Sequence, residues 1–317
     1  MINKIGIVGG GNIGGVAVSE IVNRGLARNV GLVDVKEPDF AAGKCLDIAE
    51  ATPVYGRDIN LEGSKTYEVL EGADFVINTA GVPRKARPDG SFPSREELLA
   101  TNLKITDMVA KGIKKYAPQA FVISIANPLD AIVYRLHKKL RCKSNRIMGM
   151  AGVLDSSRYK YFVAREANVS VENIEAVVLG GHGDTMVPIR SACRIYGLPV
   201  EQFVSKADLA KIEKRTRGAG GEVVGLLGSG SAFVSPAISA LEMVEAIAFD
   251  KRKIVHVAAY LKGEYGVKNL FLGVPVILGK NGIEEIIKIK LTPEEKKNLR
   301  ISINAVKKTA GEVDKVR

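Results

Sequence analysis

Apolar and polar positions form two kinds of block along the first 150 residues. Short apolar runs, such as Ile5–Val8, suit strands that are buried on both faces of a parallel sheet. Longer stretches between them, such as Val16–Val22, carry apolar residues at helical spacing. The pattern predicts strands at 3–8, 29–34, 58–62, 73–79, 119–125 and 145–149, and helices at 11–25, 39–52, 95–116 and 128–141. This alternation predicts an α/β fold with an N-terminal doubly wound parallel sheet.

The pattern changes near Ala151. A helix is expected through about residue 167 and a strand over 174–179, and helices then dominate from 201 to 250. In this part Gly218–Gly221 is expected to bend a helix, and Pro236 to mark the start or a kink of the next. Three strands near 253–262, 269–279 and 283–290 and a charged helix from 292 follow. We expect two domains, 1–150 and 151–317, the second a mixed α+β substrate domain.

A glycine-rich turn follows the first strand and opens the first helix. Gly9 would allow the sharp turn, Gly11 would let the backbone approach a pyrophosphate, and Gly14 would let helix and strand pack closely. Such turns also occur as plain connections. The full turn comprises Gly9, Gly10, Gly11, Asn12, Ile13 and Gly14.

An acidic residue, Asp34, ends the second predicted strand twenty positions after Gly14. A carboxylate there would accept hydrogen bonds from the adenosine ribose and repel a 2′-phosphate, although it could also be a simple turn residue. Turn and acid together predict that residues 1–150 form a Rossmann domain that binds NAD rather than NADP.

Composition narrows the class of protein. The three cysteines, Cys45, Cys142 and Cys193, form no C-x-x-C pair, so we expect buried or inert thiols in a reducing compartment and neither disulfides nor a metal site. No signal-peptide pattern or membrane-length apolar stretch is visible, which predicts a cytoplasmic protein.

The net charge of +11 would suit a nucleic-acid partner. The basic residues of 135–143 and 211–217, however, fall on helix-like stretches with apolar positions and without interleaved aromatics. Solvated helix faces explain them more simply, and a positive field would also attract an anionic cofactor and substrate. We expect no nucleic-acid and no membrane partner.

A long loop is predicted over 81–94, where prolines and glycines exclude regular structure. It follows a central strand, at the carboxyl edge of the sheet where ligands bind, so we expect a mobile lid rather than an ordinary surface loop. Its cations, Arg84, Lys85 and Arg87, together with Arg95 at the next helix start, suggest an anionic ligand.

Three histidines are present, and their contexts differ. His137 lies in a basic helix and is expected on its surface, and His256 is expected as a strand residue. His182 stands between two glycines at a strand end, which favours a catalytic imidazole over a turn residue. Asp155 and Arg158 share one helix face: they form either a local ion pair or a group in which Asp155 orients His182 and Arg158 binds a substrate carboxylate.

These motifs together resemble the malate and lactate dehydrogenase family, specifically its lactate dehydrogenase-like malate dehydrogenases. The stretches that carry the resemblance occur in family order and span most of the chain: Gly9–Gly14, Asp34, Thr79–Lys85, Ser94–Asn102, Ile125–Pro128, Gly152–Arg158 and Gly180–Asp184.

The resemblance implies a reversible, NAD-linked oxidation of a 2-hydroxy acid in a homodimer or homotetramer. It implies that His182 accepts the hydroxyl proton, Asp155 supports His182, and Arg158 anchors the C1 carboxylate. It also implies that Asn127 touches the substrate oxygen and the nicotinamide, and that Arg95 polarises the carbonyl. The residues implied to line the cofactor track are Thr79, Ala80, Gly81, Asn102, Ile125 and Ala126.

Substrate choice in that family depends on the position of Arg84. A cation there suits the second carboxylate of malate, and leaving it unpaired would penalise pyruvate by about a few kcal/mol. The loop is longer here than the family pattern, so Arg87 could compete with Arg84. The alternatives are a lactate dehydrogenase or broad 2-oxoacid reductase and, outside enzymes, a dinucleotide sensor or a basic nucleic-acid-binding protein.

Overall fold

The fold is described from a computed structural model of the chain, which describes residues 2–82, 94–228 and 230–316; for Arg95 it describes the backbone alone. The predicted loop over 81–94 therefore lies almost wholly outside the described residues, as do Arg84, Lys85 and Arg87. The lid expected there stays a prediction.

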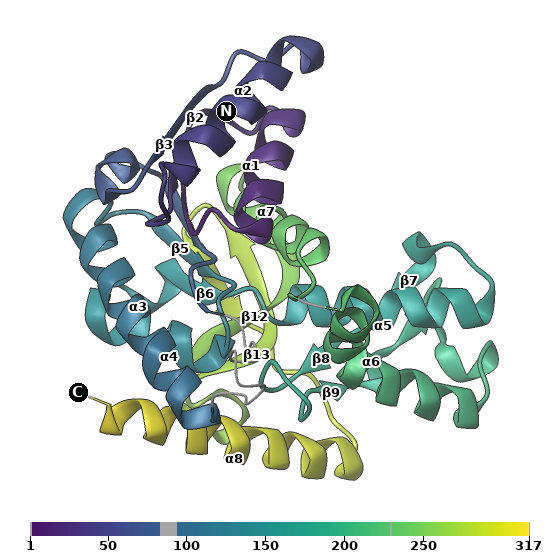
Figure 1. The fold of residues 1–317 in the computed structure, drawn as a ribbon. Helices are drawn as coiled ribbons and strands as arrows, with labels where there is room; N and C mark the ends of the chain where they lie inside the picture. The colour runs from purple at the N-terminus through teal and green to yellow at the C-terminus, as the bar shows by residue number, and fades with distance from the viewer. Residues whose placement is uncertain (1, 83–93, 229, 317) are drawn as a thin grey trace.

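The N-terminal half forms a parallel sheet with helices, as the sequence predicted (Figure 1). Its strands run in the order β3-β2-β1-β4-β5-β6, and the order reverses between β1 and β4. In an open α/β sheet, this reversal opens a crevice at the carboxyl ends of the strands. The strands are β1 (Ile2–Val8), β2 (Ala27–Val33), β3 (Asn60–Ser64), β4 (Phe75–Asn78), β5 (Phe121–Ser124) and β6 (Ile147–Gly149). The helices are α1 (Asn12–Arg24), α2 (Phe40–Tyr55), α3 (Arg95–Tyr116) and α4 (Leu129–Leu140).

Three antiparallel strands from the second half extend this same sheet. β12 (Lys253–Lys262) pairs with β6 through Ala258 and Gly149, and β13 (Lys268–Gly279) and β14 (Gly282–Ile286) follow it as hairpins. β14 is shorter than the predicted strand 283–290. The result is one nine-stranded sheet that runs through both halves of the chain. The division at residue 150 stays a prediction.

Of the helices of the second half, three pack against its part of the sheet, and the fourth, α6, packs against α5. α7 lies against α1, and α8 runs beside α4 and β13 (Figure 1). α6 continues through Gly218–Gly221 as one helix, and Pro236 lies in the first turn of α7. The helices are α5 (Gly152–Ala167), α6 (Lys206–Leu227), α7 (Val234–Ala248) and α8 (Pro293–Lys315).

The single strand predicted over 174–179 is wrong. Instead, β7 and β8 belong to two different small sheets. Between them the chain makes other hydrogen bonds: the carbonyl of Val177 accepts the amide of Ile189, and the hydroxyl of Ser156 accepts the amide of Val178. The short strands are β7 (Ile174–Glu175), β8 (Val178–Leu179), β9 (Val187–Pro188), β10 (Arg194–Ile195) and β11 (Leu198–Pro199). Short 3-10 helices are η1 (Tyr67–Leu70), η2 (Ser144–Arg146), η3 (Val171–Asn173), η4 (Arg190–Ala192), η5 (Val200–Gln202) and η6 (Glu264–Gly266).

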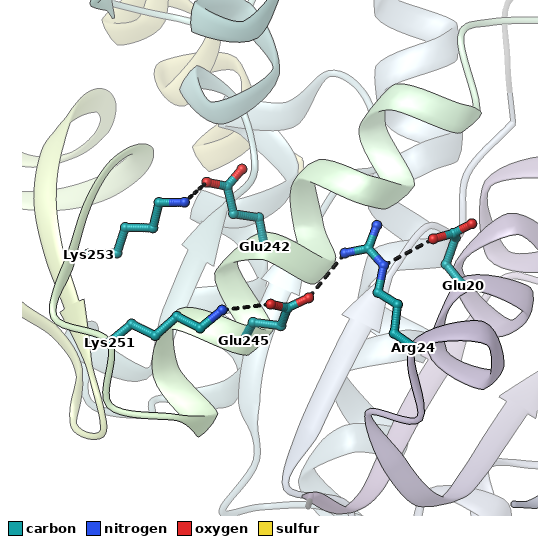
Figure 2. A network of polar contacts seen from close by, with 6 residues as sticks. All are labelled: Glu20, Arg24, Glu242, Glu245, Lys251 and Lys253. Carbon is teal, nitrogen blue, oxygen red and sulfur yellow. Dashed lines mark hydrogen bonds and ion pairs between the residues drawn. The ribbon is translucent and has the colours of Figure 1, made fainter. Parts of the chain in front are cut away.

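The main apolar core joins the two halves. Ile21 of α1 and Val244 of α7 belong to one cluster of buried side chains. At the rim of this contact, the Arg24 guanidinium bonds Glu20 on its own helix at 3.0 Å and Glu245 on α7 at 3.1 Å (Figure 2). Glu245 also pairs with Lys251 at 2.7 Å, so a chain of charges follows the α1–α7 contact.

Helix α4 differs from its prediction in three details. It begins at Leu129, with Pro128 as the N-cap residue rather than the first helical residue. The Arg135 side chain, expected in solvent, is buried and forms a double hydrogen bond to Asp107 of α3 at 2.7 Å for each contact. His137 is half-buried because its ring contacts the rings of Tyr260 and Phe271. The predictions of exposed Arg135 and His137 side chains failed because α3 covers Arg135 and the C-terminal strands cover His137.

Candidate functional site

The glycine-rich turn lies at the carboxyl end of β1 and is tightly packed. Gly9 has a φ of +102°, which an L side chain rarely adopts, and a Cβ on Gly14 would lie 1.9 Å from the carbonyl oxygen of Gly9. A Cβ on Gly11 would meet no atom within 4 Å. Gly9 and Gly14 are thus required by the turn itself, whereas Gly11 presents open backbone at the start of α1, where an anion would be favoured.

Asp34 contacts this turn directly. Its Oδ2 accepts the amide of Gly10 at 2.6 Å, and its Oδ1 accepts the amide of Lys36 at 3.0 Å. These bonds fix the carboxylate beside the turn while each oxygen keeps a further lone pair. The acid therefore lies next to the glycine turn with acceptor capacity left over, and its role in binding a ribose stays a prediction.

The ends of β4 and β5 meet at the same edge of the sheet. The Thr79 hydroxyl donates to the carbonyl of Gly9 at 2.9 Å, which joins the β4 end to the glycine turn. Asn102, only 2% exposed, donates to the carbonyls of Val82 and Asn127 at 3.2 and 3.0 Å and accepts the amide of Val82 at 2.8 Å. Asn102 therefore links, by hydrogen bonds, the segments that follow β4 and β5.

His182 and Asp155 form the central polar pair of the site. Nδ1 of His182 lies 2.8 Å from Oδ2 of Asp155, and NH1 of Arg158 donates to Oδ1 of the same carboxylate at 3.2 Å. The Asp155 side chain is only 3% exposed, and that of His182 is 13% exposed. The ion pair between Asp155 and Arg158 and the predicted contact between Asp155 and His182 are therefore both present, whereas the binding of a substrate carboxylate by Arg158 stays a prediction.

Four elements hold the loop that carries His182. Just after β8, Gly180 exchanges backbone hydrogen bonds with Gly273 of β13 at 3.0 and 2.9 Å. The amide of Gly181 donates to Ser302 of α8 at 2.9 Å, and the amide of His182 donates to Oδ2 of Asp130 on α4, also at 2.9 Å. With α5 supplying Asp155, both the backbone and the ring of His182 are fixed.

The charges around His182 favour its protonated form. Burial opposes protonation, but the carboxylates of Asp155 and Asp130 outweigh both burial and the opposing Arg158, so the pKa of His182 lies above its ordinary value. Burial raises the pKa of Asp130 to about 6. An imidazole with a raised pKa and a bonded Nδ1 is suited to exchange a proton through Nε2 near neutral pH.

The other two histidines lie apart from this group. His256 of β12 has Nδ1 3.3 Å from the hydroxyl of Ser156, and burial, with the nearby Lys160 cation, lowers its pKa to about 4. Burial also lowers the pKa of His137. Both rings are therefore neutral near pH 7, and neither has the pair of carboxylates that raises the pKa of His182.

Three arginines of the predicted site are not placed by the structure. Arg84 and Arg87 lie outside the described residues, and Arg95 is described only as the first backbone unit of α3. Conversely, the sequence reasoning missed Asp130 and Ser302, which hold the His182 loop. Asp130 gave one signal, since it lies three positions after the predicted site residue Asn127; Ser302 gave none.

Three further observations concern the described part of the chain. Within residues 2–82, 94–228 and 230–316, no cluster of three or more His, Cys, Asp or Glu side chains has the geometry to hold a metal ion. In the same ranges no helix is long and apolar enough to cross a membrane. Burial raises the pKa of Cys45 to about 11 and that of Cys193 to about 12, in keeping with unreactive thiols.

Comparison with known proteins assigns the chain to a family. Residues 3–149 match the NAD-binding domain model of lactate/malate dehydrogenases, and residues 152–316 match the α/β C-terminal domain model of the same family. The chain belongs to the lactate/malate dehydrogenase family. It is thus an NAD-dependent 2-hydroxy-acid dehydrogenase, which confirms the predicted enzyme class and cofactor.

The chain is similar to malate dehydrogenases and to lactate dehydrogenases. A malate dehydrogenase of Geotalea uraniireducens is 49% identical over 314 residues, covering 96% of each chain. Among solved structures, a Cryptosporidium parvum malate dehydrogenase has a TM-score of 0.93 at 38% identity, covering 99% of each chain. A lactate dehydrogenase of the same organism, solved with lactic acid and NAD, has a TM-score of 0.94 at 38% identity, covering 100% of this chain and 99% of its own. The fold alone therefore does not separate the two substrates.

Proposed function

We propose that the protein is an NAD-dependent malate dehydrogenase that interconverts (S)-malate and oxaloacetate. The observation that carries the catalytic part is the 2.8 Å contact between His182 and Asp155 with Arg158 on the same carboxylate. The choice of malate is supported by the Geotalea relative and by Arg84 in the sequence.

In this proposal malate loses a proton from its C2 hydroxyl and a hydride from C2. Nε2 of His182 takes the hydroxyl proton, and bound NAD would supply the acceptor for the hydride. Asp155 holds Nδ1, fixes the ring orientation and stabilises the imidazolium that forms. Arg158 binds the C1 carboxylate, and Asn127 and Arg95 contact the substrate oxygen.

The cofactor lies, in the same proposal, along the carboxyl edge of the sheet. The α1 N-terminus and the open backbone at Gly11 face the pyrophosphate, and Asp34 binds the adenosine ribose. The residues that line the track are Gly9, Gly10, Gly11, Asn12, Ile13, Gly14, Asp34, Thr79, Ala80, Gly81, Asn102, Ile125, Ala126 and Asn127.

A four-way steady-state assay tests the function. Oxaloacetate and pyruvate are each reduced with NADH and with NADPH, and we expect the highest kcat/KM for oxaloacetate with NADH. Higher kcat/KM with pyruvate would instead make the protein a lactate dehydrogenase, like the similar Cryptosporidium parvum enzyme.

The role of His182 is tested separately by His182→Asn. Loss of the proton acceptor should lower kcat by about 10²–10⁴-fold, while NADH binding measured by fluorescence stays close to that of the wild type. His137→Asn is the control, because His137 lies apart from the site. Equal turnover in His182→Asn and the wild type would exclude His182 as the proton acceptor.

The two loop arginines offer a matched pair for substrate choice. Arg84→Gln should lower the preference for oxaloacetate over pyruvate at least about tenfold, since an uncharged residue no longer requires a second carboxylate. Arg87→Gln should leave the ratio near that of the wild type. The reverse result would transfer the specificity role to Arg87.

The same proposal includes expectations about the assembly, the compartment, the partners and the domains. We propose a homodimer or homotetramer in the cytoplasm, with a dicarboxylate as the small-molecule substrate and no nucleic-acid or membrane partner. We also retain 1–150 as the NAD-binding domain and 151–317 as the substrate domain. Sedimentation at several protein concentrations decides the assembly.

A further inference from the structure

Asp130 is a partly buried acid that the proposed reaction has not used. It lies in the first turn of α4, and its Oδ2 accepts the backbone amide of His182 at 2.9 Å. Its other oxygen, Oδ1, is buried and has no hydrogen-bond partner among the described residues. A carboxylate with an unbonded buried oxygen is costly, so its presence beside His182 calls for an explanation.

Gly181, in the loop that carries His182, allows the Asp130 carboxylate to approach the backbone closely. A Cβ on Gly181 would lie 3.1 Å from Oδ2 of Asp130 and 2.4 Å from a methyl carbon of Val306. Glycine at 181 therefore lets the loop lie directly between α4 and α8. If Asp130 only had to accept one amide, a neutral side chain would do so without burying an ionisable group.

Among the described residues, three charged groups face His182. Asp155 of α5 is at Nδ1, Asp130 of α4 is at the backbone amide, and Arg158 of α5 opposes the two acids. Asp130 thus supplies a second negative charge from a different helix. Both acids favour the protonated imidazole, and the arginine disfavours it.

We propose that Asp130 is a positioning residue for the reaction: it fixes the backbone of His182, and its negative charge stabilises the imidazolium that forms when His182 accepts the substrate's hydroxyl proton. The proposal rests on the proposed role of His182. In malate oxidation the ring passes from neutral to protonated as hydride leaves C2, so the field of Asp130 favours that step. In oxaloacetate reduction the same negative charge keeps His182 protonated until it donates its proton.

Ser302 provides the matched control. It accepts the neighbouring amide, Gly181 N–H, at the same 2.9 Å distance, and it is fully buried. It therefore supports the same loop without carrying a charge. Loss of Ser302 tests anchoring alone, whereas loss of the Asp130 charge tests anchoring and electrostatics together.

The first experiment compares pH profiles of wild type, Asp130→Asn and Ser302→Ala. Asparagine keeps an oxygen that can accept the amide of His182 but removes the charge. For malate oxidation, which needs neutral His182, we expect the rising limb of kcat/KM to move to lower pH by about half a unit or more in Asp130→Asn. The falling limb of oxaloacetate reduction should move the same way. Ser302→Ala should keep both limbs in place.

The second experiment measures the charge effect without turnover. The chain has three histidines, so ring NMR signals can be titrated directly and His182 assigned with His182→Asn. A lower His182 pKa in Asp130→Asn, with no shift in Ser302→Ala, supports the proposal even if malate proves to be the wrong substrate. An unshifted His182 titration in Asp130→Asn, or an equal shift in both variants, overturns it.

A third variant covers a failure to fold. Asp130→Ser removes the charge and replaces the carboxylate by a smaller side chain with a hydroxyl group on Cβ. It should lower the His182 pKa as Asp130→Asn does, and an unchanged titration in this variant also overturns the proposal.

Discussion

At the scale of single residues, two histidines of this protein respond to acid in opposite senses. His256 is held neutral by burial with a pKa of about 4, whereas the carboxylates near His182 hold its pKa above the ordinary value. A proton binds the unfolded chain more readily than folded His256, but binds folded His182 more readily than the unfolded chain. The two rings therefore contribute to stability in opposite directions as pH falls.

This contrast predicts the pH dependence of two variants. Relative to His256→Gln, the wild type should lose up to about 3 kcal/mol of unfolding free energy as pH falls from about 7 to about 4. In this range His256 is protonated in the unfolded chain but stays neutral in the folded protein. Relative to His182→Gln, the wild type should gain stability as pH falls, since that contribution is present below the ordinary pKa and lost above the raised one. Urea unfolding across this pH range measures both; parallel curves for wild type and His256→Gln would contradict the first expectation.

The glycine turn yields a second prediction at this scale. Gly14→Ala should cost roughly 1–3 kcal/mol of stability, because its Cβ would overlap the Gly9 carbonyl. Gly11→Ala meets open space and should change stability by less than about 0.5 kcal/mol. Both variants should weaken NADH binding, measured by fluorescence titration. Gly14→Ala displaces the turn, and the methyl group of Gly11→Ala obstructs the approach of the pyrophosphate. Unchanged NADH affinity in Gly11→Ala would remove that role from Gly11.

At the scale of elements, two similar ion pairs differ in burial. Arg135 joins α4 to Asp107 of α3 through two hydrogen bonds, with 9% of its side chain exposed. Arg215 bonds Glu222 through two hydrogen bonds within α6, with 57% exposed. Solvent screens the second pair, and only the first fixes two helices together.

Arginine-to-lysine replacement at these two positions should therefore have unequal effects. Arg135→Lys keeps the charge but loses the planar fork and the contact to the Val316 carbonyl, so we expect a loss of roughly 1–2 kcal/mol. Arg215→Lys should stay within about 0.5 kcal/mol of the wild type. Denaturant unfolding compares them, and equal losses would refute the argument from burial.

The elements that the sequence predicted well are those with a strong local pattern. Most of the parallel strands, and the helices α1, α3 and α4, were found because continuous apolar runs and apolar residues at helical spacing are visible in the sequence itself. Strand 174–179 failed because the partners of its two ends, β10 and β9, are short strands without a pattern. The burial of Arg135 was missed because α3 approaches only in three dimensions.

The candidate site divides in the same way. His182, Asp155 and Arg158 were predicted from their contexts and are brought together by the fold. Asp130 and Ser302 are 52 and 121 positions from the residues whose amides they accept, and an acid or a serine on a helix has many ordinary explanations. Their importance depends on contacts that no local pattern encodes.

At the scale of the whole molecule, the two halves share structure rather than merely touching. Strand β12 extends the N-terminal sheet through β6, the core cluster includes side chains of both α1 and α7, and Arg24 pairs with Glu245 across that contact. Separating the halves would expose this common core to water.

We therefore expect both halves to unfold in one transition. The chain has no tryptophan, so Tyr55→Trp in the first half and Tyr196→Trp in the second, both at exposed positions, give separate fluorescence probes. Their urea midpoints should coincide within error. Two clearly separated midpoints would show that the halves are independent folding units.

The Gly180–Gly273 bridge has a consequence for how such a protein can change over evolutionary time. The described supports of His182 come from β13, α4, α5 and α8, whereas Arg84 belongs to the stretch that follows Val82. None of these described supports belongs to the stretch that carries Arg84. If Arg84 sets the substrate as proposed, exchanges at that position alter substrate choice while the described supports of His182 keep their sequence, so the two properties can change separately.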